Sequence, residues 1–176
     1  LLYGIGLKLR KLPFPVVASV NGLAVGAGMN LALCCDYIIA SERASFSQSF
    51  SKLALIPGFG GTHLLVNQAT WQKACEMAFL GEPFSATDMK GLGFVNKIVP
   101  HDELERESLA IAEKFAGGPT LAFARTKELF LRGINSPFEE HLAYERGVQV
   151  KSAGTDDYAA GVRAMNSKVE PEFKGS

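Results

Sequence analysis

The feature that most constrains this chain is a glycine-rich stretch that joins two apolar runs. Residues 16–36 read VVASVNGLAVGAGMNLALCCD. The β-branched start predicts a buried strand at 16–20, the three glycines at 22–28 predict a turn, and the apolar residues at 29–36 predict a buried helix. A strand, turn and helix in this order present free backbone N–H groups to an anion. The stretch therefore predicts either an anion-binding turn or a turn whose glycines only allow tight packing of strand on helix.

Two well-known phosphate-binding motifs do not match this stretch. The GxGxxG pattern of dinucleotide-binding folds needs a third glycine, and Leu31 stands at that position. A Walker A loop needs Gly-Lys-Ser/Thr after the turn, and none follows here. The turn is therefore not predicted to bind a dinucleotide or a P-loop nucleotide.

Length and charge limit the possible partners. The 176 residues suffice for one domain with a sizeable core and a small second lobe. Formal net charge is zero, which argues against a nucleic-acid surface and against electrostatic membrane binding. No apolar run reaches the roughly 20 residues that a membrane span needs.

The three cysteines, Cys34, Cys35 and Cys75, lack metal-site spacing and are predicted to be free thiols. No targeting segment is visible, so the compartment stays open, with the cytoplasm expected for a bacterial protein.

Turn and capping residues predict the remaining elements. Strands are predicted at 37–41, 44–47 and 94–99. Helices are predicted at 62–66, from Thr70 to Gly81, from Ser85 to Gly93, from Asp102 to Gly117, and after Pro119, Ser136 and Thr155. Ser136 is predicted to cap the helix that follows it, and Trp71, Phe79 and Phe84 are predicted to lie in the core. The chain is thus expected to hold strand–turn–helix units at 1–101 and a helical region at 102–176.

Several motifs in this order and at this spacing make the sequence similar to the crotonase (enoyl-CoA hydratase/isomerase) family. The matching elements are PVVASVNG at 15–22, Gly26-Ala27-Gly28, Cys35-Asp36, Phe46-Ser47-Gln48, IPGFGGT at 56–62 and GLGFV at 91–95. The stretch from Phe50 to Pro57 looks most like the 1,2-epoxyphenylacetyl-CoA isomerase branch. The resemblance implies an α/β fold, a crotonase-type spiral of ββα units with a C-terminal helical trimerisation region, and hence a homo-trimer or hexamer.

The resemblance also implies the substrate and part of its site. Members of the family bind an acyl-CoA thioester as substrate, need no further cofactor or metal, and stabilise a thioester enolate with two backbone N–H groups. The second donor falls on Ala27, with Gly26 and Gly28 on either side of it, while the first lies on an earlier loop that is expected before Leu1. Substrate contacts are further implied for Leu53 and, near the CoA phosphates and adenine, for Lys168 and Phe173. For the last two, an exposed tail is the alternative.

The acidic side chains that the family uses are missing at their expected positions. The two glutamates of the hydratases fall on Asn30 and Phe50, and the acid that follows the loop proline in isomerases falls on Gly58. Asn30 is expected to bind a water or a substrate oxygen, and Phe50 to widen or floor a pocket for an aromatic acyl group. Three interpretations stay open: another residue such as His63 moves the proton, substrate or bound water does so, or the protein is inactive. The sequence predicts an enoyl-CoA isomerase or hydratase, with an impaired CoA-binding or assembly subunit as the alternative.

Overall fold

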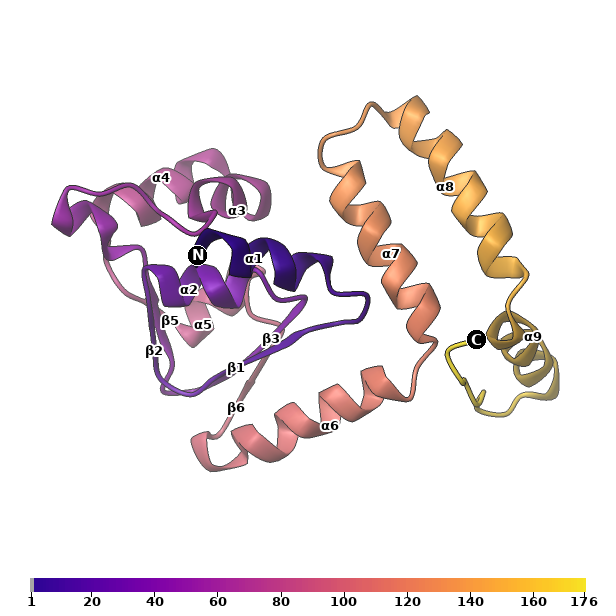
Figure 1. The fold of residues 1–176 in the computed structure, drawn as a ribbon. Helices are drawn as coiled ribbons and strands as arrows, with labels where there is room; N and C mark the ends of the chain where they lie inside the picture. The colour runs from indigo at the N-terminus through magenta and orange to yellow at the C-terminus, as the bar shows by residue number, and fades with distance from the viewer. Residues whose placement is uncertain (1) are drawn as a thin grey trace. The chain divides into compact units, whose positions relative to one another are not determined.

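The computed structural model describes residues 2–176, and these form two compact units (Figure 1). The first unit holds the residues up to Arg10 together with Val16–Ala110, and the second holds Lys11–Pro15 and Ile111–Ser176. The division falls inside helix α6 (Leu104–Ala116). The assignment of separate domains at 1–101 and 102–176 stays a prediction.

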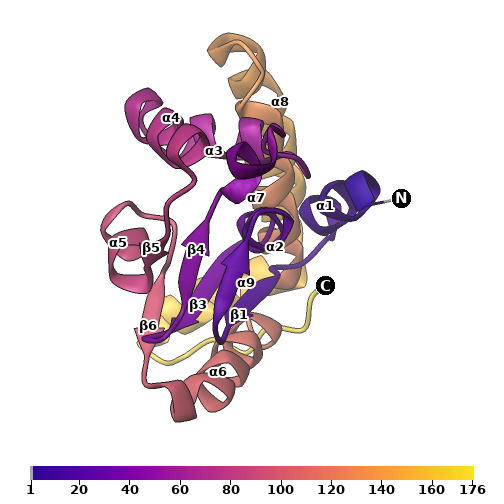
Figure 2. The ribbon, with the colours of Figure 1, turned by 90° about the vertical axis from the view of Figure 1, so that its left-hand side faces the viewer.

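The first unit is built on two small sheets of short strands (Figure 2). One sheet is parallel throughout, in the order β1 (Val17–Val20), β3 (Tyr37–Ser41), β6 (Lys97–Val99). The other has the order β2 (Leu23–Val25), β4 (Ser45–Ser47), β5 (Phe84–Ser85), with β2 parallel and β5 antiparallel to β4. In the first sheet, the central strand β3 is largely buried, which accounts for its continuous apolar sequence.

Helices of the first unit enclose a main apolar core, and Ile39, Val99 and Leu104 form a smaller separate cluster. The helices are α1 (Leu2–Lys11), α2 (Ala27–Leu33), the 3-10 helix η1 (Ser49–Leu53), α3 (Gly61–Gln68), α4 (Trp71–Leu80), α5 (Ala86–Gly91), the 3-10 helix η2 (His101–Glu103) and α6. The side chains that fill the core come from both sheets and helices, with Met29, Leu33, Phe46, Leu65, Met77 and Met89 almost fully buried. This core fixes α2 and β4, which carry the candidate site.

Two predicted helix starts are confirmed. Thr70 Oγ1 accepts a hydrogen bond from the Lys73 N–H at 3.3 Å at the start of α4. Ser85 and Asp88 form a reciprocal capping box at the start of α5, because the Ser85 N–H donates to the Asp88 carboxylate and the Asp88 N–H donates to Ser85 Oγ. Local hydrogen-bonding chemistry was sufficient to place both helices.

Three other predictions were wrong. The turn predicted at 22–28 contains strand β2, whose residues pair with β4. Ser136 does not cap α8 (Phe138–Ala153), because its hydroxyl donates to the Arg132 carbonyl of the preceding helix at 2.9 Å. Trp71 and Phe79 are 68% and 73% exposed on α4, so among the three predicted core aromatics only Phe84 packs against the core.

The second unit is made of three helices and a returning tail. Helices α7 (Thr120–Gly133) and α8 pack side by side, and α9 (Asp156–Ser167) follows a turn at Gly154. The Arg132 guanidinium lies 4.2 Å from the centre of the Tyr144 ring, and the Tyr144 hydroxyl donates to Glu128. These contacts hold α7 against α8 mainly through side chains at their surface.

No helix within residues 2–176 is both long enough and apolar enough to cross a membrane.

Candidate active site

The site begins with a backbone turn that only glycine adopts readily. Gly26 has φ 54° and ψ −114°, a conformation that a residue with a β-carbon avoids. The Gly26 N–H donates to the Ser47 carbonyl at 2.8 Å, which extends the pairing of β2 with β4 by one bond. The turn therefore ends β2 and starts α2 at a position fixed by β4.

Ala27 is the first residue of α2 and supplies a backbone donor at the surface. Ala27 and Gly28 are both exposed. The first hydrogen bond of the helix runs from the Asn30 N–H to the Gly26 carbonyl at 3.0 Å. The N–H groups before Asn30, including that of Ala27, have no acceptor within the helix. The turn thus presents the Ala27 N–H with a small side chain that leaves room for a ligand oxygen.

Phe50 lies against this turn. A β-carbon built on Gly26 would lie 3.3 Å from Phe50 Cε2 and 3.4 Å from Cζ, so the ring covers the glycine closely. Phe50 belongs to η1 and is half-buried. At one of the positions where the resemblance places a glutamate, the site therefore has an apolar ring next to the backbone donor.

Asn30 is fully buried, and both ends of its amide are engaged by the protein. Its Oδ1 accepts from Gln48 Nε2 at 2.6 Å, and its Nδ2 donates to the Gly58 carbonyl at 2.7 Å and lies 3.4 Å from Gln48 Oε1. Gln48 is also fully buried. The Asn30 amide thus has protein partners at both ends, and the expectation that it binds a water or a substrate oxygen stays a prediction.

The loop that carries Gly58 closes tightly on this amide. The Gly58 carbonyl accepts a second bond from the Gly61 N–H at 2.9 Å. A β-carbon on Gly61 would lie 2.3 Å from Asn30 Nδ2, so the close approach of the amide requires glycine there. Gly58 itself does not have a positive φ, and a side chain at this position meets no left-handed backbone strain.

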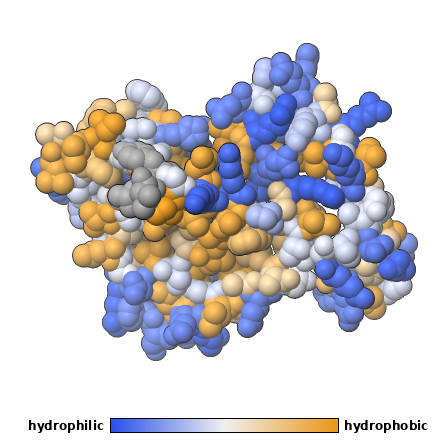
Figure 3. All heavy atoms as spheres, in the orientation of Figure 1, coloured by the Kyte–Doolittle hydropathy of each residue, from blue (hydrophilic) through white to orange (hydrophobic). Residues whose placement is uncertain are grey.

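Exposed apolar side chains lie on β2, which leads into the turn, and on η1 and the residues that follow it. Leu53, expected to contact substrate, ends η1 and is 72% exposed, and the neighbouring Leu55, Ile56, Leu23 and Val25 are exposed as well. Figure 3 shows broad apolar areas on the surface of the first unit. These segments therefore offer exposed apolar surface.

Other candidate residues have structural partners or lie apart from the turn. His63 is exposed on α3. The Asp36 carboxylate accepts from the Val16 N–H at 2.8 Å, which gives this residue a structural role. The three cysteines are thiols that are not joined in disulfides, and burial raises the pKa of the Cys34 thiol, with Arg10 acting in the opposite direction. Over residues 2–176, no cluster of His, Cys, Asp and Glu side chains is arranged to hold a metal ion.

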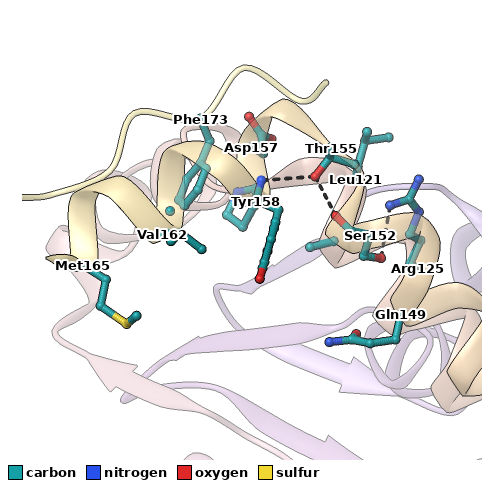
Figure 4. Close-up of a pocket in the computed structure, with 13 residues that line it drawn as sticks. Leu121, Arg125, Gln149, Ser152, Thr155, Asp157, Tyr158, Val162, Met165 and Phe173 are labelled. Atoms are coloured by element: carbon teal, nitrogen blue, oxygen red, sulfur yellow. Dashed lines mark hydrogen bonds between the residues drawn. The ribbon is translucent and has the colours of Figure 1, made fainter.

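The second unit has a pocket of its own, of about 490 Å³ (Figure 4). Its lining is mostly apolar, with Leu121, Val162, Met165 and Phe173 among the walls and Arg125, Gln149 and Tyr158 as polar groups. Arg125 donates to Ser152 Oγ at 3.1 Å. Phe173 lies against Gly161, whereas Lys168 is exposed and ends α9 with φ 54°.

The tail that carries Phe173 is held by a buried carboxylate. Asp157 accepts from the N–H groups of Lys174 at 2.7 Å and Gly175 at 3.0 Å, and its own N–H donates to the Ser176 carbonyl at 3.0 Å. Sequence reasoning missed this contact and the Asn30–Gln48 pair, because both join residues far apart in the chain. An Asp in the first turn of a helix was the only local signal for the first of them.

The fold and the turn define a class: an α/β domain of short strands and helices in which a glycine-flanked, exposed residue begins a helix. The family model for enoyl-CoA hydratase/isomerase matches residues 4–176. The chain belongs to the enoyl-CoA hydratase/isomerase family.

Individual relatives agree with this assignment. A protein named "Probable enoyl-CoA hydratase" from Rhodobacter capsulatus is 38% identical over 163 residues, which cover 93% of this chain and 63% of that protein. The 1,2-epoxyphenylacetyl-CoA isomerase of Escherichia coli is 36% identical over 168 residues, covering 96% of this chain and 64% of the relative. A solved enoyl-CoA hydratase from Polaromonas sp. JS666 superposes with a TM-score of 0.94 at 32% identity, covering 98% of this chain and 67% of that structure. The chain spans less than two thirds of the length of these curated relatives.

Proposed function

We propose that the protein containing this chain binds an acyl-CoA thioester and stabilises its enolate through the Ala27 N–H, in an isomerisation or hydration of an enoyl-CoA. The observation that carries the proposal is the Gly26–Ala27 turn, which fixes an exposed backbone donor among apolar side chains. Fixed donors placed where negative charge develops are worth about 3–4 kcal/mol each in a transition state. Membership of the family and the names of the relatives support the acyl-CoA substrate.

The proton transfers of such a reaction find no carboxylate at Asn30, Phe50 or Gly58. General acid–base catalysis typically contributes about 10²–10⁴ in rate. We therefore propose that the thioester is polarised normally while proton transfer relies on the substrate, on bound water or on His63. The Phe50 ring beside Gly26 supports an apolar acyl group, including an aromatic one.

Binding and turnover test the proposal separately. We expect the full-length protein to bind acetoacetyl-CoA at micromolar concentration in calorimetry. We expect it to hydrate crotonyl-CoA about 10²–10⁴ times more slowly than a hydratase with both glutamates, because neither acid is present. No binding at millimolar ligand would reject an acyl-CoA site. Tight binding without any turnover of enoyl-CoA would favour the alternative of a CoA-binding or assembly subunit.

A substitution at Gly58 tests whether the pocket is arranged for allylic proton transfer. Because Gly58 lacks a positive φ, Gly58→Asp introduces a carboxylate without left-handed strain. We expect it to raise isomerisation of a 3-enoyl-CoA by about 10²-fold, the usual worth of a placed general base. Product formation and thermal stability are measured together, with Gly58→Asn as the uncharged control. A stable variant that binds CoA and isomerises no faster would argue against the isomerase reaction.

We also propose a homo-trimer or hexamer. Large apolar side chains on α7 and α8, among them Phe130, Phe138 and Val150, are exposed in the chain by itself. Burial of such side chains is the main driving force for subunit association. Sedimentation of the full-length protein at several concentrations tests this, and a monomer throughout would reject it.

A further inference from the structure

We infer that Asn30 is a positioning residue, which acts through the loop at 57–61 and through Gln48 to hold the Ala27 donor in place. This inference rests on the proposed function for its effect on ligand binding. Asn30 lies one turn after Ala27 in α2, and its N–H donates to the Gly26 carbonyl at 3.0 Å. Its side chain forms hydrogen bonds with Gln48 and with the Gly58 carbonyl, which both lie in segments distant in sequence from the turn.

The hydrogen bonds around Asn30 have a fixed direction. The Gly58 carbonyl can only accept, so the atom that faces it must be the Nδ2 donor of Asn30. Oδ1 is then left to accept, and it receives the Gln48 Nε2 donor at 2.6 Å. The chain of bonds therefore runs from Gln48 through Asn30 to Gly58, and reversing either amide would place two acceptors face to face.

The loop at the end of this chain needs to be held. Phe59 has φ 57°, a left-handed conformation that is unfavourable for an aromatic residue, and Gly60 follows with φ 81°. Such backbone strain persists only where the surroundings over-determine it. The Asn30 amide on the Gly58 carbonyl, one residue before Phe59, provides such a constraint from inside the core.

Other contacts join the segments that Asn30 bonds to the rest of the candidate site. The Gly26 N–H is already bonded to Ser47, the residue before Gln48, so the turn is attached to the end of β4 at two points. Phe50, two residues after Gln48, lies on Gly26. Loss of the Asn30 donor would release the loop at Gly58 and loosen α2 against β4, and a donor displaced by a fraction of an ångström stabilises an oxyanion less well.

The test exploits the fact that a carboxyl group can replace the amide only while it is protonated. In Asn30→Asp, a neutral carboxyl has one O–H to donate to the Gly58 carbonyl and one oxygen to accept from Gln48. Ionisation removes the donor and sets a buried carboxylate oxygen against the Gly58 carbonyl, so the pKa of this group is raised in the folded protein. Stability relative to the unsubstituted protein is then greatest at acid pH and is lost as pH rises through that raised pKa.

Two readouts are taken at about pH 5 and about pH 8. The first is thermal unfolding without ligand, and the second is the affinity for acetoacetyl-CoA together with the near-ultraviolet absorbance of its bound enolate. We expect Asn30→Asp to bind about tenfold more weakly than the unsubstituted protein at pH 8 and within about threefold at pH 5. Asn30→Leu, which has no donor, should bind weakly and give little enolate at both pH values.

Asn67→Asp is the matched control, because the Asn67 amide also donates to a backbone carbonyl, that of His63 at 2.8 Å, but at an exposed site. It should behave like the unsubstituted protein. The titratable groups on the elements around Asn30 are Cys34 at the C-terminal end of α2, Lys52 of η1 and His63 of α3. Because all three groups are present in every variant, their titration affects every variant alike and does not change the comparison between variants.

The outcomes separate this inference from the proposed function. If the unsubstituted protein binds no acyl-CoA, the proposed function fails and the positioning role fails with it. If the unsubstituted protein binds normally and Asn30→Asp does so too at pH 8, or if its losses of stability and affinity are the same at both pH values, the positioning role is wrong while the proposed function stands.

Discussion

The two units of this chain are stabilised in different ways. In the first, side chains from both sheets and from α2 to α5 meet in one core, where Phe46 and Met29 are fully buried. In the second, the two long helices α7 and α8 contain no buried residue, and Phe138 is 73% exposed. The first unit is therefore stabilised mainly by burial of its own apolar side chains. The second unit depends more on polar contacts and on burial of its exposed apolar side chains against another protein surface.

In each unit a buried polar residue joins segments that are distant in sequence, and the chemistry of the two residues differs. Asn30 uses a neutral amide, with one donor and one acceptor each matched to a partner. Asp157 uses a carboxylate, which accepts from two consecutive tail N–H groups. An amide fixes the direction of its hydrogen bonds, while a carboxylate accepts from any donor. The amide therefore suits the placement of a donor in the site, and the carboxylate suits the attachment of a tail.

The largest expected effect contrasts two phenylalanines. Phe46→Ala removes a fully buried ring of β4 and should cost about 3–5 kcal/mol of stability. Phe138→Ala removes a largely exposed ring of α8 and should cost less than about 0.5 kcal/mol in dilute protein. Urea unfolding, combined with hydrogen exchange of amides in each unit, measures both.

Protein concentration sharpens this comparison. If α8 contributes to a subunit interface, the cost of Phe138→Ala should grow with concentration, because the oligomer then adds to the apparent stability. The cost of Phe46→Ala should not change with protein concentration. Equal costs for the two substitutions in dilute protein would show that the contrast between the units is mistaken.

Much of the fold could be predicted because its signals are local. Thr70 and the Ser85–Asp88 pair bond to N–H groups within one turn, so sequence spacing alone places them. Strand β2 was missed because only three residues of the glycine-rich stretch are extended, and their pairing with β4 is a tertiary contact. Ser136 was misassigned because its hydroxyl had two possible partners and bonds to the helix behind it.

The candidate site was predictable only where it depends on the backbone turn. The glycine spacing by itself left open whether the turn binds an anion or only allows tight packing, and the resemblance to the family implied the donor at Ala27. The environment of Asn30 could not be inferred, since its partners Gln48 and Gly58 lie 18 and 28 residues away. Tertiary packing decides whether a polar side chain at this position faces a ligand or the protein. No pattern in the neighbouring sequence predicts which of the two occurs.

A smaller effect is expected from the tail attachment of the second unit. Asp157→Asn keeps the shape of the side chain but replaces one acceptor oxygen with a donor, which then faces the Lys174 or Gly175 N–H. We expect a loss of about 1–3 kcal/mol, because a buried hydrogen bond is broken and its donor left unsatisfied. Hydrogen exchange at Lys174 and Gly175 should accelerate. The control is Asp156→Asn, an exposed carboxylate beside it. Unchanged exchange at both tail amides would show that Asp157 does not hold the tail.

The smallest effect compares two serines at helix junctions, one in each unit. Ser85→Ala removes the cap of α5 and should cost about 1 kcal/mol, whereas Ser136→Ala removes only a bond to the preceding helix and should cost less than about 0.5 kcal/mol. Thermal unfolding at neutral pH measures both.

Acidity distinguishes the two serines further. Hydrogen bonds from Ser85 lower the pKa of the Asp88 carboxyl below its ordinary value. The capping box therefore stabilises the fold at pH values above the ordinary carboxyl pKa of about 4, and this contribution is lost as pH falls through the lowered folded pKa. The difference between Ser85→Ala and the unsubstituted protein should accordingly shrink in acid, while the difference for Ser136→Ala should not change with pH. If the two serines gave the same cost and the same pH dependence, helix capping would not distinguish the two units.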